Sequence, residues 1–135
     1  MADPASYHAR WRQLLALADR SASVLEGDAD WEIVFRFYAS MHLVEGLMRT
    51  KDSRFWSDKH ETRRGALKGS PEVRGALAPY LDLQDLSENV RYDPGFIVDE
   101  THFEKAKQWA TKVESVVRAK LEAKLPVPPT PQPAS

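Results

Sequence analysis

The longest apolar stretch of the chain covers residues 31–48, with the sequence WEIVFRFYASMHLVEGLM. Its hydrophobic residues recur around nearly the whole circumference of an α-helix, which is typical of a helix at the centre of a bundle. Three polar residues, Tyr38, His42 and Glu45, interrupt this pattern at steps of four and three. Such steps place all three on one face of the helix. Because a buried polar group without a partner costs about 1–3 kcal/mol, we expect neighbouring helices to supply partners.

Capping signals predict where the first two helices begin. Asp3 and Pro4 have the order of an N-cap residue followed by proline at the first helical position. Asp30 is well placed to cap the central helix. Glu32 and Arg36 are four residues apart on that helix, which predicts an ion pair.

Further helical periodicity follows the central segment. We expect a short third helix that ends at Gly69, and a fourth that begins at Pro71 and is kinked or split by Pro79. Thr101 and Glu104 have capping-box spacing, which predicts the start of the last helix.

The pattern as a whole predicts an all-α fold. No segment alternates with period two for long enough to form a strand, and residues 96–98 are too few to pair alone. Short connections between the helices favour an up-and-down bundle of four to five helices. We expect a single domain at residues 1–125, followed by a proline-rich, disordered tail at residues 126–135.

Composition limits the function classes. The 135 residues carry a net charge of -1, so any binding of nucleic acid requires a local basic patch. The chain contains no cysteine, which excludes disulfides, thiolate metal sites and cysteine nucleophiles. Neither a signal peptide nor an apolar run of about 20 residues is present, and we therefore expect a cytoplasmic protein without contact to a membrane.

Several short motifs occur in a fixed order along the chain. FYASMHLVE at residues 37–45 is followed by His60 and Arg63 as HxxR, by Tyr80-Leu81, and by a terminal Arg91-Tyr92. This series resembles HEPN-type proteins (higher eukaryotes and prokaryotes nucleotide-binding domain), in particular their small stand-alone bacterial forms. The resemblance covers roughly residues 31–92.

The resemblance implies a helical bundle that is usually a homodimer. The superfamily includes metal-independent ribonucleases, toxins and phage-defence proteins beside inactive binding members. Its ribonucleases need a base, an acid and a cation for the phosphorane charge, work suited to histidine and arginine. The candidate catalytic residues in this chain are His42, His60, Arg64 and Arg91, and the supporting candidates are Tyr38, Glu45, Tyr80 and Tyr92.

The ribonuclease motif itself departs from the family pattern. Active members carry Arg, four to six residues and then His near the start of a late helix. Here the pair with that spacing is Arg54 and His60, between the central and third helices, and Arg91 finds no histidine before His102. We therefore expect a degenerate or absent ribonuclease motif and a protein that binds RNA or a nucleotide.

A purely structural interpretation also fits these residues. In it His42 is hydrogen-bonded to Glu45, Tyr38 or Tyr80, while Arg63 and Arg64 face solvent. The chain would then be a non-catalytic module for dimerisation or for binding a protein partner.

Two other interpretations concern ligands. Arg54, Lys59 and Arg63 lie in a basic stretch beside two aromatic residues, which favours contact with nucleic acid, although a solvated face has the same pattern. His42 and Glu45 have a spacing that suits a metal ion, but the second copy of the motif that di-iron bundles carry is missing. We expect no metal and no cofactor.

Overall fold

The computed structural model describes residues 3–24, 30–51 and 60–125, and for residues 21–24, 60 and 61 it describes the backbone alone. Within these ranges the chain forms five α-helices and one short 3₁₀ helix, and no strand. The elements are α1 (Pro4–Val24), α2 (Asp30–Lys51), α3 (His60–Gly69), the 3₁₀ helix η1 (Arg74–Ala76), α4 (Leu77–Tyr92) and α5 (Glu100–Glu122). The predicted all-α fold is confirmed.

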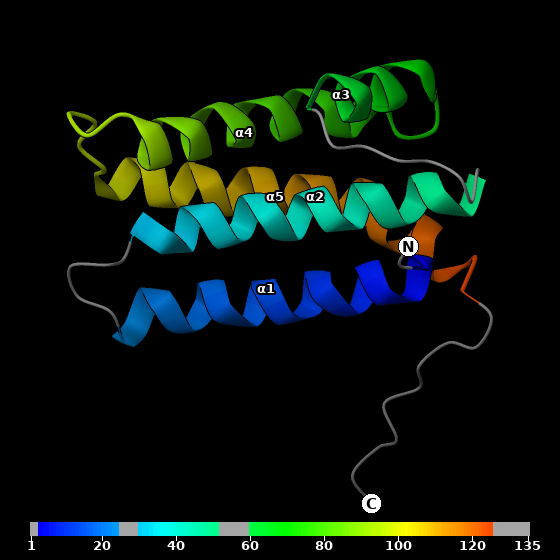
Figure 1. Ribbon diagram of the computed structural model, residues 1–135, viewed down its shortest axis with the longest axis horizontal. Helices are drawn as coiled ribbons and strands as arrows, with labels where there is room; N and C mark the ends of the chain where they lie inside the picture. The colour runs from blue at the N-terminus through cyan, green and yellow to red at the C-terminus, as the bar shows by residue number, and fades with distance from the viewer. Residues whose placement is uncertain (1–2, 25–29, 52–59, 126–135) are drawn as a thin grey trace, which may run out of the picture.

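The four long helices run alternately up and down along the molecule (Figure 1). The central helix α2 packs against α1 on one side and against α4 and α5 on the other. The short elements α3 and η1 lie at the end of the bundle where α2 finishes, next to the start of α4. Both the up-and-down arrangement and the central place of the longest apolar segment are as predicted.

The hydrophobic core surrounds α2. Side chains from α2, α4 and α5 form one cluster that solvent does not reach, and each buried aliphatic side chain contributes about 1.5–3 kcal/mol. Its fully buried members include Ile33, Phe37, Leu43 and Leu47 from α2, Tyr80 and Leu83 from α4, and Val113, Val117 and Leu121 from α5. This burial fixes the positions of the helices, so the polar groups of α2 are held at defined places among them.

Gly46 marks the point where α1 and α5 come closest to α2. A Cβ atom at Gly46 would lie 3.0 Å from Cδ2 of Leu121 and 3.1 Å from Cβ of Tyr7, both tighter than ordinary van der Waals contact. The close approach of α1 also brings the Tyr7 ring to 5.7 Å from the His42 ring, measured between centroids.

Two predictions about polar residues in the first two helices are confirmed. The Asp3 side chain accepts a hydrogen bond of 2.9 Å from the backbone N–H of Ser6, and α1 begins at Pro4. The Arg36 Nε donates to Glu32 at 3.0 Å, and its Nη2 donates to Asp19 on α1 at 3.0 Å. The pair predicted within α2 therefore also ties α2 to α1.

The prediction that a fourth helix begins at Pro71 was wrong. Residues 71–73 form a turn, η1 follows, and α4 begins at Leu77. Pro79 therefore falls in the first turn of α4, where backbone N–H groups have no partner within the helix and proline costs little. α4 continues past Pro79 to Tyr92 as one helix, so the split expected at Pro79 does not occur.

The start of the last helix also differs from the prediction. Asp99, rather than Thr101, is the N-cap of α5: its carboxylate accepts from the backbone N–H of His102 at 3.1 Å. The His102 Nδ1 in turn accepts from the backbone N–H of Asp99 at 3.0 Å. A histidine thus takes the place that glutamate usually holds in a capping box, which a search for Ser or Thr followed by Glu does not find.

The helical part ends at a buried Leu125, just after α5. The tail predicted at residues 126–135 lies outside the described residues. Among the helices that the structure describes, none combines the length and the hydropathy needed to cross a membrane.

Candidate functional site

The three polar residues of α2 meet partners from three different helices. Tyr38 bonds to Arg91 on α4, Glu45 pairs with Arg63 on α3, and His42 faces Tyr7 on α1. The prediction that neighbouring helices supply partners holds for Tyr38 and Glu45.

Glu45, Arg63 and Tyr80 form a group that we call the buried network. The Arg63 Nη1 donates to Glu45 at 3.3 Å, and its Nε donates to the Tyr80 hydroxyl at 3.0 Å. The side chains of Arg63 and Glu45 are 6% and 5% exposed, and Tyr80 is fully buried. An arginine and a carboxylate taken out of water need each other, so this network joins α3 and α4 to the middle of the bundle.

Burial keeps the Tyr80 hydroxyl protonated. Loss of solvent, opposed in part by the charge and hydrogen bond of Arg63, raises the pKa of Tyr80 to about 12. At neutral pH the phenol is therefore uncharged and accepts the Arg63 hydrogen bond. A group with this pKa is a poor acid or base near pH 7.

Tyr38, Arg91 and Tyr92 form a second group, the Arg91 cluster. The Arg91 Nη1 donates to the Tyr38 hydroxyl at 2.7 Å, and the Arg91 Nε donates to the Ser87 carbonyl at 3.2 Å. Its guanidinium carbon lies 4.9 Å from the Tyr92 ring centroid and 5.3 Å from that of Tyr38. The cluster reaches the surface, because Tyr92 is 73% exposed.

One donor of the Arg91 cluster is unused. The Arg91 Nη2 is shielded from solvent and has no hydrogen-bond partner in the part of the chain that the structure describes. An unsatisfied donor on a charged group costs about 1–3 kcal/mol or more. The exposed Tyr92 ring lies beside this guanidinium.

His42 lies between the two groups on α2 and is half-buried. Its Nδ1 is buried without a hydrogen-bond partner among the described residues. Burial, together with the charges of Arg10 and Arg63, lowers the pKa of His42 to about 4. The imidazole is therefore neutral at pH 7 and a weak base.

The remaining predicted residues are placed only in part. Arg64 is exposed on α3, as the structural interpretation expected. The neighbouring Arg63 is buried in the bundle, so the expectation that both arginines face solvent was wrong for Arg63. A buried Arg63 bonded to Glu45 is also not placed to bind a phosphate on the surface. The side chain of His60 and all of Arg54 and Lys59 lie outside the described residues.

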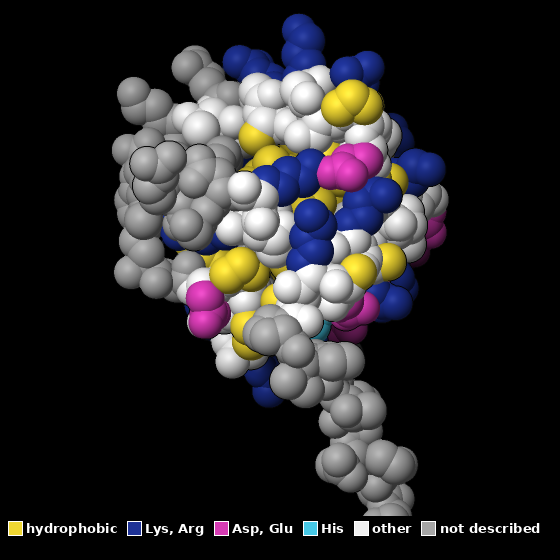
Figure 2. Space-filling model, turned by 90° about the vertical axis from the view of Figure 1, so that its right-hand side faces the viewer, with side chains coloured by type: hydrophobic (Ala, Val, Ile, Leu, Met, Phe, Trp, Pro, Cys, Tyr) yellow, Lys and Arg dark blue, Asp and Glu magenta, His cyan; other side chains and the backbone are white. Residues whose placement is uncertain are grey.

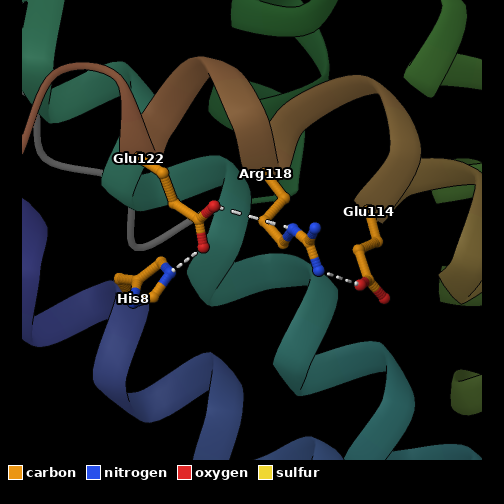
Figure 3. Close-up of polar contacts among 4 residues, drawn as sticks. All are labelled: His8, Glu114, Arg118 and Glu122. Atoms are coloured by element: carbon orange, nitrogen blue, oxygen red, sulfur yellow. Dashed lines mark hydrogen bonds and ion pairs between the residues drawn. The ribbon is translucent and has the colours of Figure 1, made fainter. Parts of the chain in front are cut away.

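A third polar group was not predicted from the sequence. The Nε2 of His8 on α1 lies 2.7 Å from a carboxylate oxygen of Glu122 at the end of α5 (Figure 3). The other Glu122 oxygen lies 3.7 Å from Nε of Arg118, which donates to Glu114 at 3.2 Å (Figure 3). This chain of contacts ties α1 to α5. Because His8 and Glu122 are 114 residues apart, no local spacing indicates it.

The arrangement of the described residues does not favour a metal site at His42 and Glu45. Within residues 3–24, 30–51 and 60–125, no three histidine, aspartate or glutamate side chains are grouped so as to hold a metal ion. Of the proposed ligands, Glu45 pairs with Arg63, and His42 presents a neutral ring toward Tyr7.

Comparison of the chain with known proteins gave no matching family model, no matching curated protein and no matching solved structure. The resemblance to HEPN-type proteins therefore stays a prediction made from the motifs alone.

Proposed function

We propose that this chain is a HEPN-like helical protein that binds single-stranded RNA at the Arg91 cluster without cutting it. The observation that carries the proposal is the state of Arg91: a partly buried residue whose Nη2 has no hydrogen-bond partner among the described residues, next to the 73% exposed ring of Tyr92. Such a cation donates hydrogen bonds to a phosphate oxygen, and a base can stack on such a ring.

The geometry suits a single strand better than a duplex. Tyr92 offers a flat face on which an unpaired base can stack, which contributes about 1–3 kcal/mol per base. The unused Nη2 of the Arg91 guanidinium can donate to a phosphate oxygen. Stacking needs a base that is free of its pairing partner, so single-stranded RNA is the ligand that uses both groups.

Three properties of the site favour binding over cleavage. His42 has a pKa of about 4, which makes it a weak base for the proton of a 2′-hydroxyl at neutral pH. Tyr80 has a pKa of about 12 and stays protonated. Arg63 is held by Glu45 and Tyr80 inside the bundle, away from any surface phosphate.

Fluorescence anisotropy with a labelled, uridine-rich RNA of about 16 nucleotides, the upper end of common site sizes for single-stranded nucleic acid, tests the proposal. Tyr92→Ala should weaken binding about tenfold, because one stacked base is lost. Tyr92→Phe keeps the ring and should bind nearly as tightly as the original chain. Ile97→Ala is the matched control, since Ile97 is 82% exposed and offers no ring.

The outcomes separate binding from catalysis. Equal affinity of Tyr92→Ala and Ile97→Ala would exclude the Arg91 cluster as the binding site. Incubation of the same RNA with the purified chain in the presence of a chelator should leave it intact. Cleavage that disappears in His42→Ala would instead support the metal-independent ribonuclease.

Exposed apolar side chains favour one alternative, a module for dimerisation or for binding a protein partner. Trp31 is 50% exposed and Ile97 is 82% exposed, and exposed apolar groups of this size are often covered by partners. Sedimentation analysis of the original chain and of Trp31→Asp and Ile97→Asp would test it. A dimer that either substitution splits would support this alternative, and a monomer at all concentrations would exclude self-association.

A further inference from the structure

Basic side chains gather on one end of the bundle, the end where α2 and α5 finish. Figure 2 looks onto this end and shows lysine and arginine side chains around acidic ones. We call the following five residues the basic end: Lys51 of α2, Lys68 of α3, Arg74 of η1, Lys120 of α5 and Lys124 just beyond α5.

The Glu72 carboxylate interacts electrostatically with three of these cations. A hydrogen bond from Lys51, together with the Lys51 charge, lowers the pKa of Glu72, and the charges of Lys120 and Lys124 lower it further. Glu72 is fully exposed and forms an ion pair with Lys51. One carboxylate is therefore surrounded by three lysines from two helices that meet at this end.

The remaining cations of the basic end, Lys68 and Arg74, are within four residues of Glu72 along the chain. Arg74 is two residues further along the chain, and its Nε donates to the carbonyl of Lys68 at 3.2 Å. Acidic groups in the last part of α5 are already engaged, because Glu114 and Glu122 contact Arg118 and His8 (Figure 3). Four of the five cations are exposed and Lys120 is partly buried, and the exposed Glu72 carboxylate pairs with Lys51 of this group.

Helix dipoles explain part of this arrangement. Lys51, Lys68 and Lys120 lie in the last turns of α2, α3 and α5, where a cation interacts favourably with the partial negative charge of the helix end. Arg74 lies in η1 and Lys124 lies two residues beyond α5, so both are outside those turns. Like charges at one surface repel each other, and an anion with several charges would relieve that repulsion.

We infer that the basic end binds the phosphate backbone of the same RNA whose bases stack at the Arg91 cluster. This inference rests on the proposed function, and it adds a second, sequence-independent contact. From Tyr38 to Lys51 the α2 axis rises about 20 Å, so one RNA of about 16 nucleotides is long enough to reach both sites. Exposed lysines act as point charges that hold phosphates without selecting a base.

Salt dependence distinguishes the two contacts. For a single strand, the logarithm of the affinity falls with the logarithm of salt concentration by about 0.7 for each neutralised phosphate. The triple substitution Lys68→Gln, Lys120→Gln and Lys124→Gln should weaken binding and reduce this slope by up to about 2. Tyr92→Ala should weaken binding with little change of slope, because stacking releases no counterions.

A matched control separates the basic end from net charge alone. The substitutions Lys105→Gln, Lys107→Gln and Lys112→Gln remove the same charge from exposed positions on the other half of α5. They should leave the slope within about 0.5 of its original value if the basic end carries the contact. Circular dichroism at each salt concentration shows that the variants remain folded.

A substitution that should strengthen RNA binding tests the inference without relying on variants that lose binding. Glu72→Gln removes the carboxylate among the lysines and should tighten RNA binding severalfold at low salt, while Glu104→Gln, exposed on α5, should change affinity less. If the two triple variants behave alike and Glu72→Gln does not differ from Glu104→Gln, the basic end does not bind the RNA backbone. The proposed binding site at the Arg91 cluster is not affected by that result. No binding of RNA by the original chain would overturn both proposals.

Discussion

Two arginines, Arg63 and Arg91, each bond to a tyrosine and tie α2 to a neighbouring helix, and they differ in how far solvent reaches their surroundings. In the buried network, Arg63 is enclosed and contacts both Glu45 and Tyr80. In the Arg91 cluster, Arg91 contacts Tyr38 and an exposed Tyr92, and one of its N–H groups has no acceptor among the described residues. The same residue types therefore make a structural tie in one place and a site with unused bonding capacity in the other.

The difference between the two arginines follows from how deeply each is buried and not from the residue types involved. A charge without water depends on its partner, so loss of either member of a buried pair is expensive. At a half-exposed site water screens the charge, and the contacts of the arginine contribute little to stability. An unsatisfied group near the surface can then gain its missing bond from a ligand. Substitutions at the two arginines should accordingly have opposite profiles.

The largest effect is expected for Arg63→Ala. It removes the cation that pairs with Glu45 and the donor to Tyr80, both inside the bundle. Breaking a buried ion pair costs about 3–5 kcal/mol, so the free energy of unfolding should fall by about that amount in urea denaturation. Arg64→Ala is the matched control. Arg64 is exposed, so this substitution should change the free energy of unfolding by less than about 0.5 kcal/mol. Similar losses in both variants would show that Arg63 is not a structural tie.

A smaller loss is expected for Tyr80→Phe. The substitution keeps the buried ring and removes the hydroxyl that accepts from Arg63 at 3.0 Å. A hydrogen bond to a charged group contributes about 1.5–3 kcal/mol. The loss in free energy of unfolding, measured in urea, should therefore lie between the losses of Arg63→Ala and Arg64→Ala. In an Arg63→Ala background the same change should have almost no effect. An unchanged loss there would mean that the hydroxyl stabilises the fold through another contact.

Most of the fold could be predicted because its signals are local. The apolar pattern of residues 31–48 placed α2 at the centre, and Asp3 with Pro4 placed the start of α1. The errors came from positions where two local signals compete. Pro71 and Pro79 both suit a helix start, and the chain begins α4 between them. Asp99 with His102 forms a capping box in unusual residues, while Thr101 with Glu104 has the usual ones.

The candidate site could be predicted less completely, because its partners depend on packing. Spacing alone placed Tyr38, His42 and Glu45 on one face, and each of them does lie beside a group from another helix. Spacing does not decide whether Arg63 or Arg64 points inward, since the two differ by one step of about 100° around α3. The contact of His8 with Glu122 joins opposite ends of the sequence and has no local signal at all.

Acid should weaken the fold through His42, which lies between the two networks. Its pKa in the folded chain is about 4, below the ordinary value of 6.5, because burial and nearby arginines disfavour the charged ring. Between these values the unfolded chain binds a proton that the folded chain does not, so the contribution of His42 is complete above pH 6.5 and is lost as pH falls toward 4.

The pH effect of His42 should be smaller than the loss in Arg63→Ala, because its ring is partly exposed and solvent screens the charge. Urea midpoints at about pH 7.5 and pH 5 should differ less in His42→Gln than in the original chain. Equal differences in both proteins would assign the acid sensitivity to carboxylates instead.

The smallest effect on stability, and the sharpest test of the comparison, is expected for Arg91→Ala. The substitution loses a hydrogen bond to Tyr38 and contacts with two rings, but it also removes a buried N–H group without an acceptor in the described chain. These contributions oppose each other, so the free energy of unfolding should change by less than about 1 kcal/mol. RNA affinity should nevertheless fall by tenfold or more, since the cation that binds the phosphate is gone. A loss of stability as large as that of Arg63→Ala, with RNA affinity intact, would make both arginines structural and leave the Arg91 cluster without a ligand.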